Sequence, residues 1–238
     1  MSSIFSFKQF NVNQLNASFK VGTDALILGA LIKNDKAKQA LDIGTGTGVI
    51  SLMVAQTHPD ASIDSIELDN VNSQLAKHNF SSSSFSNRLS VIEHDFLTFS
   101  FNKKYDLIFS NPPFFLDSLQ NANDRITNSR HLSTDKLNRF AKKMVDCLKD
   151  DGAIFLIVPV ENFSSWFSAF EQQNLFLIQK IDISGKPNHV KRTVSCFSKQ
   201  KKELIESKLT IRDSAGKYTN EYIALTKDFH SVDLTTLQ

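Results

Sequence analysis

The sequence predicts an α/β protein built on an open, mostly parallel sheet of seven strands, with an antiparallel last strand and helices on both faces. Short apolar runs rich in β-branched residues alternate along the chain with stretches of helical periodicity. A glycine-rich turn follows one run at residues 44–48, and a rigid turn follows another at residues 111–114. In open parallel sheets such turns meet at the carboxyl edge, where ligands bind.

Length and composition fit one globular domain. The 238 residues are 41% hydrophobic, which is enough for a substantial core, and the formal net charge is +2. We expect a single domain over residues 1–238, with residues 1–35 as an N-terminal cover segment and helix, 36–230 as the core and 231–238 as a disordered tail. The longest apolar runs are shorter than a membrane span, and the N-terminus lacks a signal-peptide pattern. We therefore expect a cytoplasmic protein that makes no membrane contact and is a monomer or weak dimer.

Cysteine and histidine spacing gives no sign of a disulfide or a metal site. Cys147 and Cys196 lie far apart in the sequence, and the six histidines are scattered without paired spacing. Two buried thiols and no bound metal are expected.

The elements before the glycine-rich turn are a cover segment and a helix. Weak alternation over residues 4–18 predicts a short strand or hairpin. An apolar helix follows through Leu31, and Thr23 or Asp24 can cap it. Capping explains both residues, but together with Lys20 they stand where a ligand could be contacted.

The turn after the strand that ends at Ile43 carries the most informative local pattern. Asp42 is followed by Gly44, Gly46 and Gly48, and then a helix begins at Val49. Glycines let the backbone approach a ligand closely, whereas Asp42 puts a negative charge where a pyrophosphate would otherwise bind. The charge favours a cationic ligand, and the spacing lacks the third glycine position of the nicotinamide fingerprint. A tight strand-to-helix turn alone explains one glycine but not three.

Acidic residues follow the next two predicted strands. Glu67 ends the strand over 61–66, about twenty residues beyond the glycine turn, which is the usual position for an acid that binds ribose hydroxyls. Asp69 is interpreted as the N-cap of a helix over 70–79. After the strand over 89–93, Asp95 could accept from an adenine amino group while Phe96 packs on its ring. The simpler interpretation of these last two is a loop-capping Asp and a core Phe.

The turn Asn111-Pro112-Pro113-Phe114 follows a buried strand over residues 105–110. The two prolines fix two φ angles and remove two donors, so the nearby carbonyl groups stay free as acceptors. The Asn111 side-chain oxygen and the Pro112 carbonyl could each accept a hydrogen from a planar NH2 group, while Phe114 offers a face for stacking. Alone, the four residues would be interpreted as a strand-ending turn.

The remainder alternates helices and strands and ends in an antiparallel pair. Residues 115–133 are polar and predict a long loop that hangs over the active edge as a substrate-contacting flap. Further elements are predicted as a helix over 134–149 closed by Gly152, a strand over 153–160, a helical stripe with Trp166, Phe167 and Phe170, strands over 175–183 and 191–198, one more strand over 205–212 and a helix over 218–229. Basic residues that could bind phosphates gather late in the chain, at Lys186, Lys191, Arg192, Lys199, Lys201 and Lys202.

These motifs agree in order and spacing, and the chain resembles the class I, Rossmann-like S-adenosylmethionine-dependent methyltransferases. More narrowly it resembles the bacterial tRNA(Val) adenine N6-methyltransferases over residues 5–225. The motifs that carry the narrower resemblance are Phe7-Lys8-Gln9-Phe10, Lys20-Val21-Gly22-Thr23-Asp24, Leu41 to Gly48, Asn111 to Phe115 and Ser129-Arg130-His131. The chain departs from the family at one position. Phe114 stands where the family commonly has Tyr, and this change keeps the stacking ring but loses a hydroxyl.

The resemblance implies methyl transfer from S-adenosylmethionine to N6 of an adenine beside the anticodon of a valine tRNA. The Asn111 side-chain oxygen and the Pro112 carbonyl form a clamp for the amino group. The target base must leave its stack to reach this clamp. Catalytic residues are then expected at Asn111, Pro112, Pro113 and Phe114. Cofactor-binding residues are expected at Lys20, Thr23, Asp24, Asp42, Gly44, Gly46, Gly48, Glu67, Asp95, Phe96 and Asn111, and substrate-binding residues at Phe115, Arg130, His131, Lys186, Lys191 and Arg192.

Other functions fit parts of the pattern. A glutamine carboxamide of a protein substrate fits the same clamp, as does the amino group of a ribosomal guanine. Glutamine methyltransferases usually carry an N-terminal helical domain, and only about forty residues precede the glycine turn here. A noncatalytic donor-binding or RNA-binding protein is disfavoured by the intact Asn111 turn, and a nicotinamide oxidoreductase by Asp42.

Overall fold

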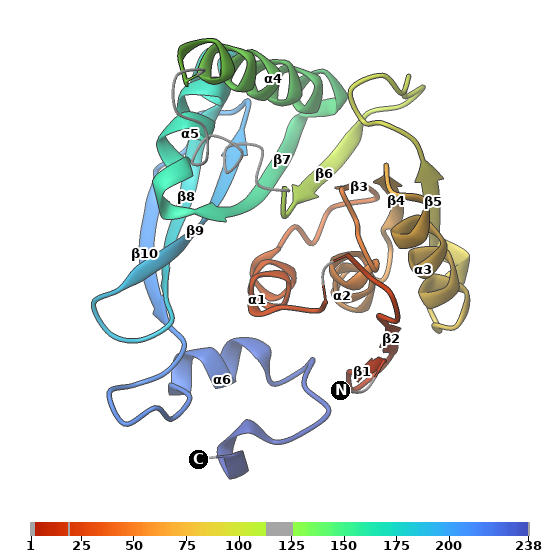
Figure 1. The fold of residues 1–238 in the computed structure, drawn as a ribbon, viewed down its shortest axis with the longest axis vertical. Coiled ribbons are helices and arrows are strands. Elements are labelled where there is room, and N and C mark those ends of the chain that lie inside the picture. Colours follow the sequence, from red (N-terminus) through yellow and green to blue (C-terminus); the bar gives the residue numbers. More distant parts are fainter. Residues whose placement is uncertain (1–2, 19, 113–125, 238) are drawn as a thin grey trace.

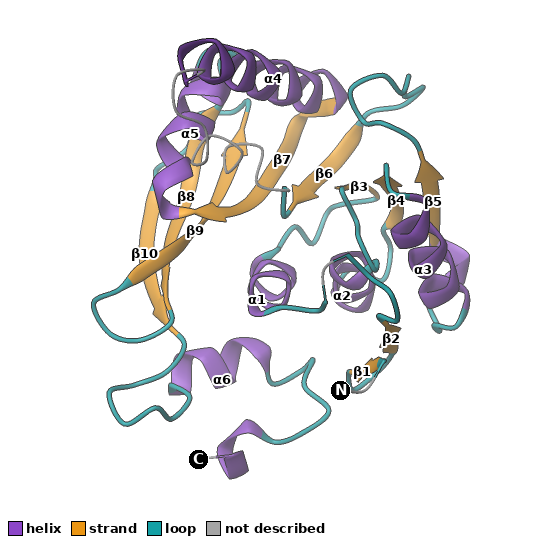
Figure 2. Cartoon of the chain, viewed as in Figure 1, coloured by secondary structure: helices purple, strands orange, loops and turns teal. Residues whose placement is uncertain are grey.

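The protein is described by a computed structural model that covers residues 3–18, 20–112 and 126–237, with only the backbone described over 126–133 (Figures 1 and 2). The main sheet consists of β3 (Gln39–Ile43), β4 (Ser62–Glu67), β5 (Leu89–Glu93), β6 (Tyr105–Ser110), β7 (Leu148–Pro159), β8 (Phe176–Ser184), β9 (Val190–Ser198) and β10 (Ile205–Thr210). Its eight strands have the order β10-β8-β9-β7-β6-β3-β4-β5. Strand β9 runs antiparallel to both of its neighbours, and the other pairs are parallel.

The mostly parallel sheet was predicted correctly, but it has one strand more than the seven expected. The strand expected over 205–212 is β10, which makes the eighth and adds to the edge of the sheet in parallel to β8, so the antiparallel strand is β9 and not the last one. Its residues Ile205 to Lys208 are exposed, because an edge strand packs little of its surface.

Helices cover both faces of the sheet, as predicted. They are α1 (Thr23–Leu31), α2 (Val49–Thr57), α3 (Asn70–Ser81), α4 (Ile126–Cys147), α5 (Phe163–Glu171) and α6 (Asn220–Thr226), with short 3-10 helices at Ser86–Arg88, Val160–Asn162 and Leu234–Leu237. Helices α1, α2, α3 and α6 contribute to one core cluster, and α4 and α5 to the other (Figures 1 and 2).

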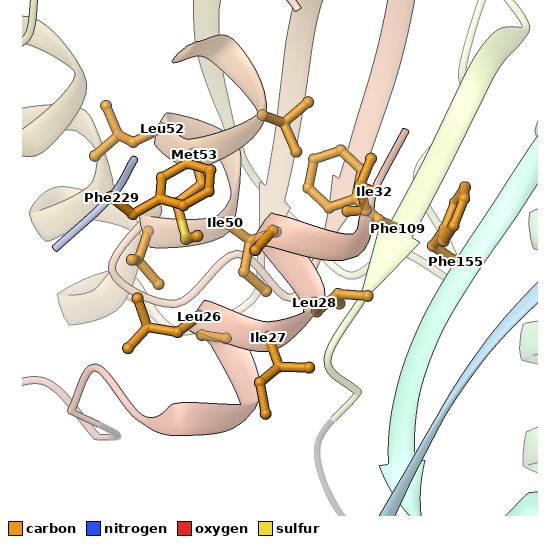
Figure 3. Close-up of a cluster of buried hydrophobic side chains, with 14 of the residues drawn as sticks. Leu26, Ile27, Leu28, Ile32, Ile50, Leu52, Met53, Phe109, Phe155 and Phe229 are labelled. Atoms are coloured by element: carbon orange, nitrogen blue, oxygen red, sulfur yellow. The ribbon is translucent and has the colours of Figure 1, made fainter. Parts of the chain in front are cut away.

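Alternating side chains of the central strands divide the core into these two clusters. Phe155 of β7 packs with the α1 and α2 side, whereas the next residue, Leu156, packs with the α4 and α5 side. Figure 3 shows Phe109 and Phe155 on the sheet beside Leu28 of α1, with Met53 of α2 in the same cluster. Because the central strands are buried on both sides, their sequences read as continuous apolar runs.

The N-terminal segment forms the predicted hairpin. Strands β1 (Ile4–Ser6) and β2 (Asn11–Asn13) pair antiparallel. The buried amide of Asn79 in α3 exchanges hydrogen bonds with the Asn13 backbone at 2.8 and 3.0 Å and donates to the Thr47 carbonyl oxygen at 2.8 Å. One side chain thus joins the hairpin, α3 and the glycine-rich turn.

Helix α4 differs most from the prediction. It begins at Ile126 instead of residue 134, so residues 126–133 belong to a helix and not to a loop. The start was missed because these residues are polar and lack an apolar stripe. Gly152 does not close the helix, since it lies inside β7. A Cβ there would come within 2.7 Å of Leu148 and 3.1 Å of the Asp106 carbonyl oxygen, so close packing in the sheet favours glycine.

The C-terminal segment also departs from the disordered tail expected for residues 231–238. Leu234 is 5% exposed and belongs to the core cluster on the α1 and α2 side. The segment is held by the N-terminal hairpin, because the Lys8 amide donates to the Phe229 carbonyl oxygen at 2.9 Å and the Ser231 hydroxyl to the Ser6 carbonyl oxygen at 2.9 Å. These contacts join distant parts of the chain and leave no local sequence signal.

Candidate active site

The carboxyl ends of three central strands bring the predicted site together. Asp42 of β3 pairs in register with Phe109 of β6, and Ile43 pairs with Ile66 of β4. The Ser110 hydroxyl at the end of β6 donates to the Ile43 carbonyl oxygen at 2.7 Å. Asn111 therefore leaves β6 beside the start of the glycine-rich turn, as the sequence predicted.

The glycine-rich turn needs its glycines for two different reasons. Gly44, Gly46 and Gly48 have φ angles of 72°, 58° and 82°, in the left-handed region that favours glycine. A Cβ on Gly46 would meet no atom of the described residues within 4 Å, whereas one on Gly48 would lie 2.4 Å from the ring of Phe80. Gly46 thus keeps a space open, and Gly48 allows α3 to pack against the turn.

This contrast gives a prediction for two matched substitutions. We expect Gly48→Ala to lower the free energy of unfolding by about 2–5 kcal/mol, since left-handed strain and overpacking act together. Gly46→Ala should cost only about 1–2 kcal/mol from strain. If a ligand approaches Gly46, this second variant should also lose ligand-induced stabilisation. Denaturant unfolding measures both variants, and equal costs would contradict the different roles assigned to the two glycines.

Asp42 is a buried carboxylate whose two oxygens differ in their hydrogen bonds. Its Oδ2 accepts hydrogen bonds from the hydroxyls of Thr45 at 2.6 Å and Ser51 at 2.7 Å. Its Oδ1 is buried and has no hydrogen-bond partner among the described residues. Burial raises the pKa of Asp42 to about 6, and the charge of Glu67 adds to the rise, although the two hydroxyls act against it. An unpaired, buried acceptor of this kind fits a cationic ligand.

Thr45 and Ser51 were not predicted as site residues. Their signal in the sequence was weak but present, because both are hydroxyl residues that follow Asp42 within the turn and the first turn of α2. A buried carboxylate needs donors, so nearby hydroxyls are the first residues to consider.

Glu67 joins the end of β4 to the glycine-rich turn. One carboxylate oxygen accepts from the Gly46 amide at 2.8 Å, and the other accepts from the Asp69 amide at 2.9 Å. Asp69 in turn accepts from the Asn72 amide at 2.8 Å and is the N-cap of α3, as predicted. The next residue after Glu67, Leu68, is 70% exposed and was not singled out from the sequence. An apolar side chain so exposed beside two carboxylates offers a surface for a flat ring.

The structure separates the roles predicted for Asp95 and Phe96. Asp95 is half-buried and accepts from the Leu97 amide at 2.8 Å, which is a loop-capping contact. Phe96 is 5% exposed and packs against Phe140 of α4 with ring centroids 4.8 Å apart. Its ring therefore belongs to the core and is not presented to a ligand, in contrast to the predicted packing on adenine.

The first turn of α1 meets the basic strand β9 at the same edge. Asp24 Oδ2 accepts from Arg192 Nε at 2.8 Å, so this guanidinium is engaged in an ion pair. Arg192 pairs with Pro159 at the carboxyl end of β7, which places the start of β9 on the active edge. Lys20 and Thr23 are exposed, and neither Thr23 nor Asp24 caps α1, because Gly22 occupies the N-cap position.

The remaining predicted residues are only partly described. Asn111 is half-buried, and its side-chain amide makes no hydrogen bond to any residue that the structure describes. Pro112 is buried. Lys186 and Lys191 are exposed at the β8–β9 connection. Pro113, Phe114 and Phe115 lie outside the described residues, as do the side chains of Arg130 and His131. Within the described ranges no cluster of His, Cys, Asp and Glu could hold a metal ion, and no helix is long and apolar enough to cross a membrane.

The arrangement of sheet and helices is that of the class I, Rossmann-like methyltransferases. A protein of Agrobacterium tumefaciens described as a predicted O-methyltransferase superposes with a TM-score of 0.69 at 17% identity, over 87% of this chain and 96% of that one. An S-adenosylmethionine-dependent methyltransferase from Clostridium acetobutylicum gives 0.51 at 14% identity, over 68% and 83% of the two chains. These similarities establish the fold alone.

Sequence comparisons narrow the class to a family. Residues 16–163 match the methyltransferase small domain. The chain is 34% identical to the tRNA1(Val) (adenine(37)-N6)-methyltransferase of a Flavobacteriaceae bacterium, over 96% of this chain and 99% of the relative. It is 37% identical to the enzyme of that name from Trichodesmium erythraeum, over 95% and 97% of the two chains. The chain belongs to the family of tRNA1(Val) (adenine(37)-N6)-methyltransferases.

Proposed function

We propose that this protein transfers a methyl group from S-adenosylmethionine to the exocyclic N6 of an adenine in tRNA, namely adenine 37 of tRNA1(Val), next to the anticodon. The observation that carries the proposal is Asn111, whose side-chain amide pairs with none of the described residues and which is held beside the glycine-rich turn by the Ser110 contact to Ile43. The family relatives that share this name match nearly the whole chain. The activity is assigned to one methyltransferase domain in a cytoplasmic protein.

The carboxyl edge fits S-adenosylmethionine as the methyl donor. Asp42 Oδ1, which has no partner within the described part of the chain, suits a positively charged ligand, and the space in front of Gly46 lets a ligand lie against the backbone. Glu67 would hold the ribose hydroxyls, Asp95 the adenine amino group and Leu68 the adenine face. S-adenosylmethionine supplies an electrophilic methyl group on a positively charged sulfur.

The acceptor side of the site orients a nitrogen. The Asn111 side-chain oxygen and the Pro112 carbonyl each accept one hydrogen of the adenine amino group, which directs the nitrogen lone pair toward the methyl group. No strong base is needed, because the clamp acts by orientation and the proton leaves after transfer. Pro113 keeps the turn rigid, and Phe114 stacks on the flipped base.

Basic residues at the same edge would bind the RNA. Lys186 and Lys191 are exposed at the β8–β9 connection and can reach phosphates. Arg192 would act through its ion pair with Asp24, which links the RNA side of the edge to the first turn of α1. We assign Phe115, Arg130 and His131 to the same RNA contact, which makes binding sensitive to salt.

Transfer of a labelled methyl group tests the proposed function. Purified protein with labelled S-adenosylmethionine should label tRNA from cells that lack this gene, and it should not label tRNA from cells that retain it. Label that enters protein and not RNA would contradict the proposal and favour glutamine N5-methylation. Label in ribosomal RNA alone would favour guanine N2-methylation.

The donor is tested separately by ligand-induced stabilisation. S-adenosylhomocysteine at about 100 times its Kd should add about 2.7 kcal/mol to the free energy of unfolding. NADH at the same concentration should add nothing, because Asp42 disfavours a pyrophosphate at the turn. Stabilisation by NADH in preference to S-adenosylhomocysteine would contradict the assignment of the donor.

A further inference from the structure

A basic groove lies on the α4 face of the molecule, away from the clamp. It has a volume of about 750 Å³ and runs between the β5–β6 connection and the C-terminal half of α4, which approach each other at the upper right of Figure 1. The charged residues that line it are Lys103, Lys104, Arg139, Lys142, Lys143 and Asp146. Five cations thus face one carboxylate, although the whole chain carries a formal net charge of only +2.

The groove extends to the edge of the sheet opposite the active edge. Tyr105, which follows Lys104 directly, pairs with Leu148 at the amino ends of β6 and β7. Asn111 lies at the other end of β6. A ligand in the groove is therefore held by a surface separate from the residues assigned to methyl transfer.

Two of the cations build the groove. Lys143 donates to the carbonyl oxygens of Leu97 at 3.0 Å and Phe99 at 2.6 Å, which holds the β5–β6 connection against α4. Lys103 is paired with Asp64 at 2.8 Å. These two charges are already compensated, so they shape the groove more than they attract a ligand.

The other three cations are available to a ligand. Lys104 and Arg139 are exposed and make no hydrogen bond or ion pair with the described residues. Lys142 is paired with Asp146 at 2.9 Å, but both side chains are 61% exposed, and such pairs contribute little. Arg139 and Lys142 are three residues apart in α4, so they lie on one face of the helix.

Aromatic rings lie between the charges. Phe99 and Phe101 are half-buried and stand edge to face, with ring centroids 4.8 Å apart. Exposed cations spaced along a groove, with aromatic surface between them, are typical of a path for a nucleic-acid backbone. A protein partner would be expected to need a larger uncharged area at the centre of its contact.

We propose that this groove binds backbone phosphates of the tRNA outside the loop that carries the target adenine. The inference rests on the proposed function, since it extends the contact between enzyme and tRNA beyond the active edge. Arg139 and Lys104 are the principal phosphate ligands, and Lys142 joins them when its surface pair with Asp146 opens. These contacts carry no base specificity and increase affinity for the whole tRNA.

The test compares a full-length transcript of tRNA1(Val) with its isolated anticodon stem-loop. The double variant Arg139→Glu/Lys104→Glu should raise the Kd for the full-length transcript about tenfold or more. The slope of log Kd against log salt should fall by about 2, one for each lost phosphate contact. The Kd for the stem-loop, and methyl transfer to it, should stay within about twofold of the wild type.

A matched control carries the same change of charge elsewhere. Lys208→Glu/Lys227→Glu alters two exposed lysines, on β10 and just after α6, and β10 is at the opposite edge of the sheet from β5. Melting temperatures check that each variant folds, and Arg139→Gln/Lys104→Gln replaces the double variant if charge reversal prevents folding.

The possible results separate the proposed RNA contact in the groove from the proposed methyl transfer. Equal Kd and salt slope for groove and control variants would overturn the inference and leave the groove to another ligand, such as a protein. Equal losses for transcript and stem-loop would overturn it too, because the contacts would then lie at the target loop. A wild-type protein that binds the transcript through the groove but transfers no methyl group would contradict the proposed function and leave the groove intact.

Discussion

Asn111→Ala is expected to lower kcat for methyl transfer by about 100- to 1000-fold, the usual cost of removing one group that acts on the transition state. The alanine leaves β6 and the Ser110 contact to Ile43 unchanged, because that contact uses the neighbouring side chain. Only the acceptor for one amino hydrogen is lost. Single-turnover transfer from labelled S-adenosylmethionine to tRNA measures the effect, and stabilisation by S-adenosylhomocysteine should remain.

Asn138→Ala is the control for this substitution. It makes the same change at another half-buried position, on the far side of the sheet in α4. We expect its kcat to match the wild type. A kcat for Asn111→Ala equal to that of the control would show that the clamp does not act in transfer. Loss of stabilisation by S-adenosylhomocysteine in Asn111→Ala would show that Asn111 acts through donor binding, for which it was also expected, and not through the adenine amino group alone.

Asp42→Asn is expected to have two opposite effects at pH 7.5. The ligand-free protein should become more stable, because a buried charge is replaced by a neutral group of the same shape. The pKa of Asp42 is raised from 3.8 to about 6, so the gain is at most about 3 kcal/mol. Stabilisation by S-adenosylhomocysteine should be lost, because the proposed contact of the carboxylate with its positively charged amino group is gone.

The effect of Asp42→Asn on the stability of the ligand-free protein depends on pH. Between pH 3.8 and about 6 the folded protein holds the Asp42 proton while the unfolded chain has released it. The contribution of Asp42 to stability is therefore complete below pH 3.8 and falls as the pH rises through this window. The gain of Asp42→Asn should be large above pH 6 and vanish near pH 4.

Thermal unfolding at several pH values measures both effects. Asp150→Asn, at a highly exposed carboxylate, is the control and should change neither. A ligand-free Asp42→Asn protein that is less stable than the wild type at pH 7.5 would contradict the raised pKa. Undiminished stabilisation by S-adenosylhomocysteine would contradict the role in donor binding.

The sequence predicted well where Asp42, the glycines, Glu67 and Asn111 lie, because the signals for their placement are local. Asp42, the three glycines and Glu67 follow buried strands directly, and the carboxyl ends of parallel strands must meet. The same rule placed Asn111 beside them. The predicted geometry was confirmed, whereas the binding and catalytic roles stay predictions.

The predictions that were wrong concern residues whose contacts join distant parts of the chain. Phe96 looked like a ligand residue because it follows Asp95, but its ring fills a space against Phe140 of α4. Gly152 looked like a helix end, whereas its backbone lies against Leu148 and Asp106 inside the sheet. Neither neighbour can be recognised from the local pattern. The pairing of Asp24 with Arg192, 168 residues apart, was likewise beyond a local reading.

The most direct test of the account is the identity of the methylated nucleoside. Mass analysis of tRNA1(Val) from a deletion strain should show unmodified adenine at position 37. Complementation with the wild-type gene should restore N6-methyladenosine there, and complementation with Asn111→Ala should not. N6-methyladenosine that persisted in the deletion strain, or that the Asn111→Ala protein restored, would contradict the proposed function.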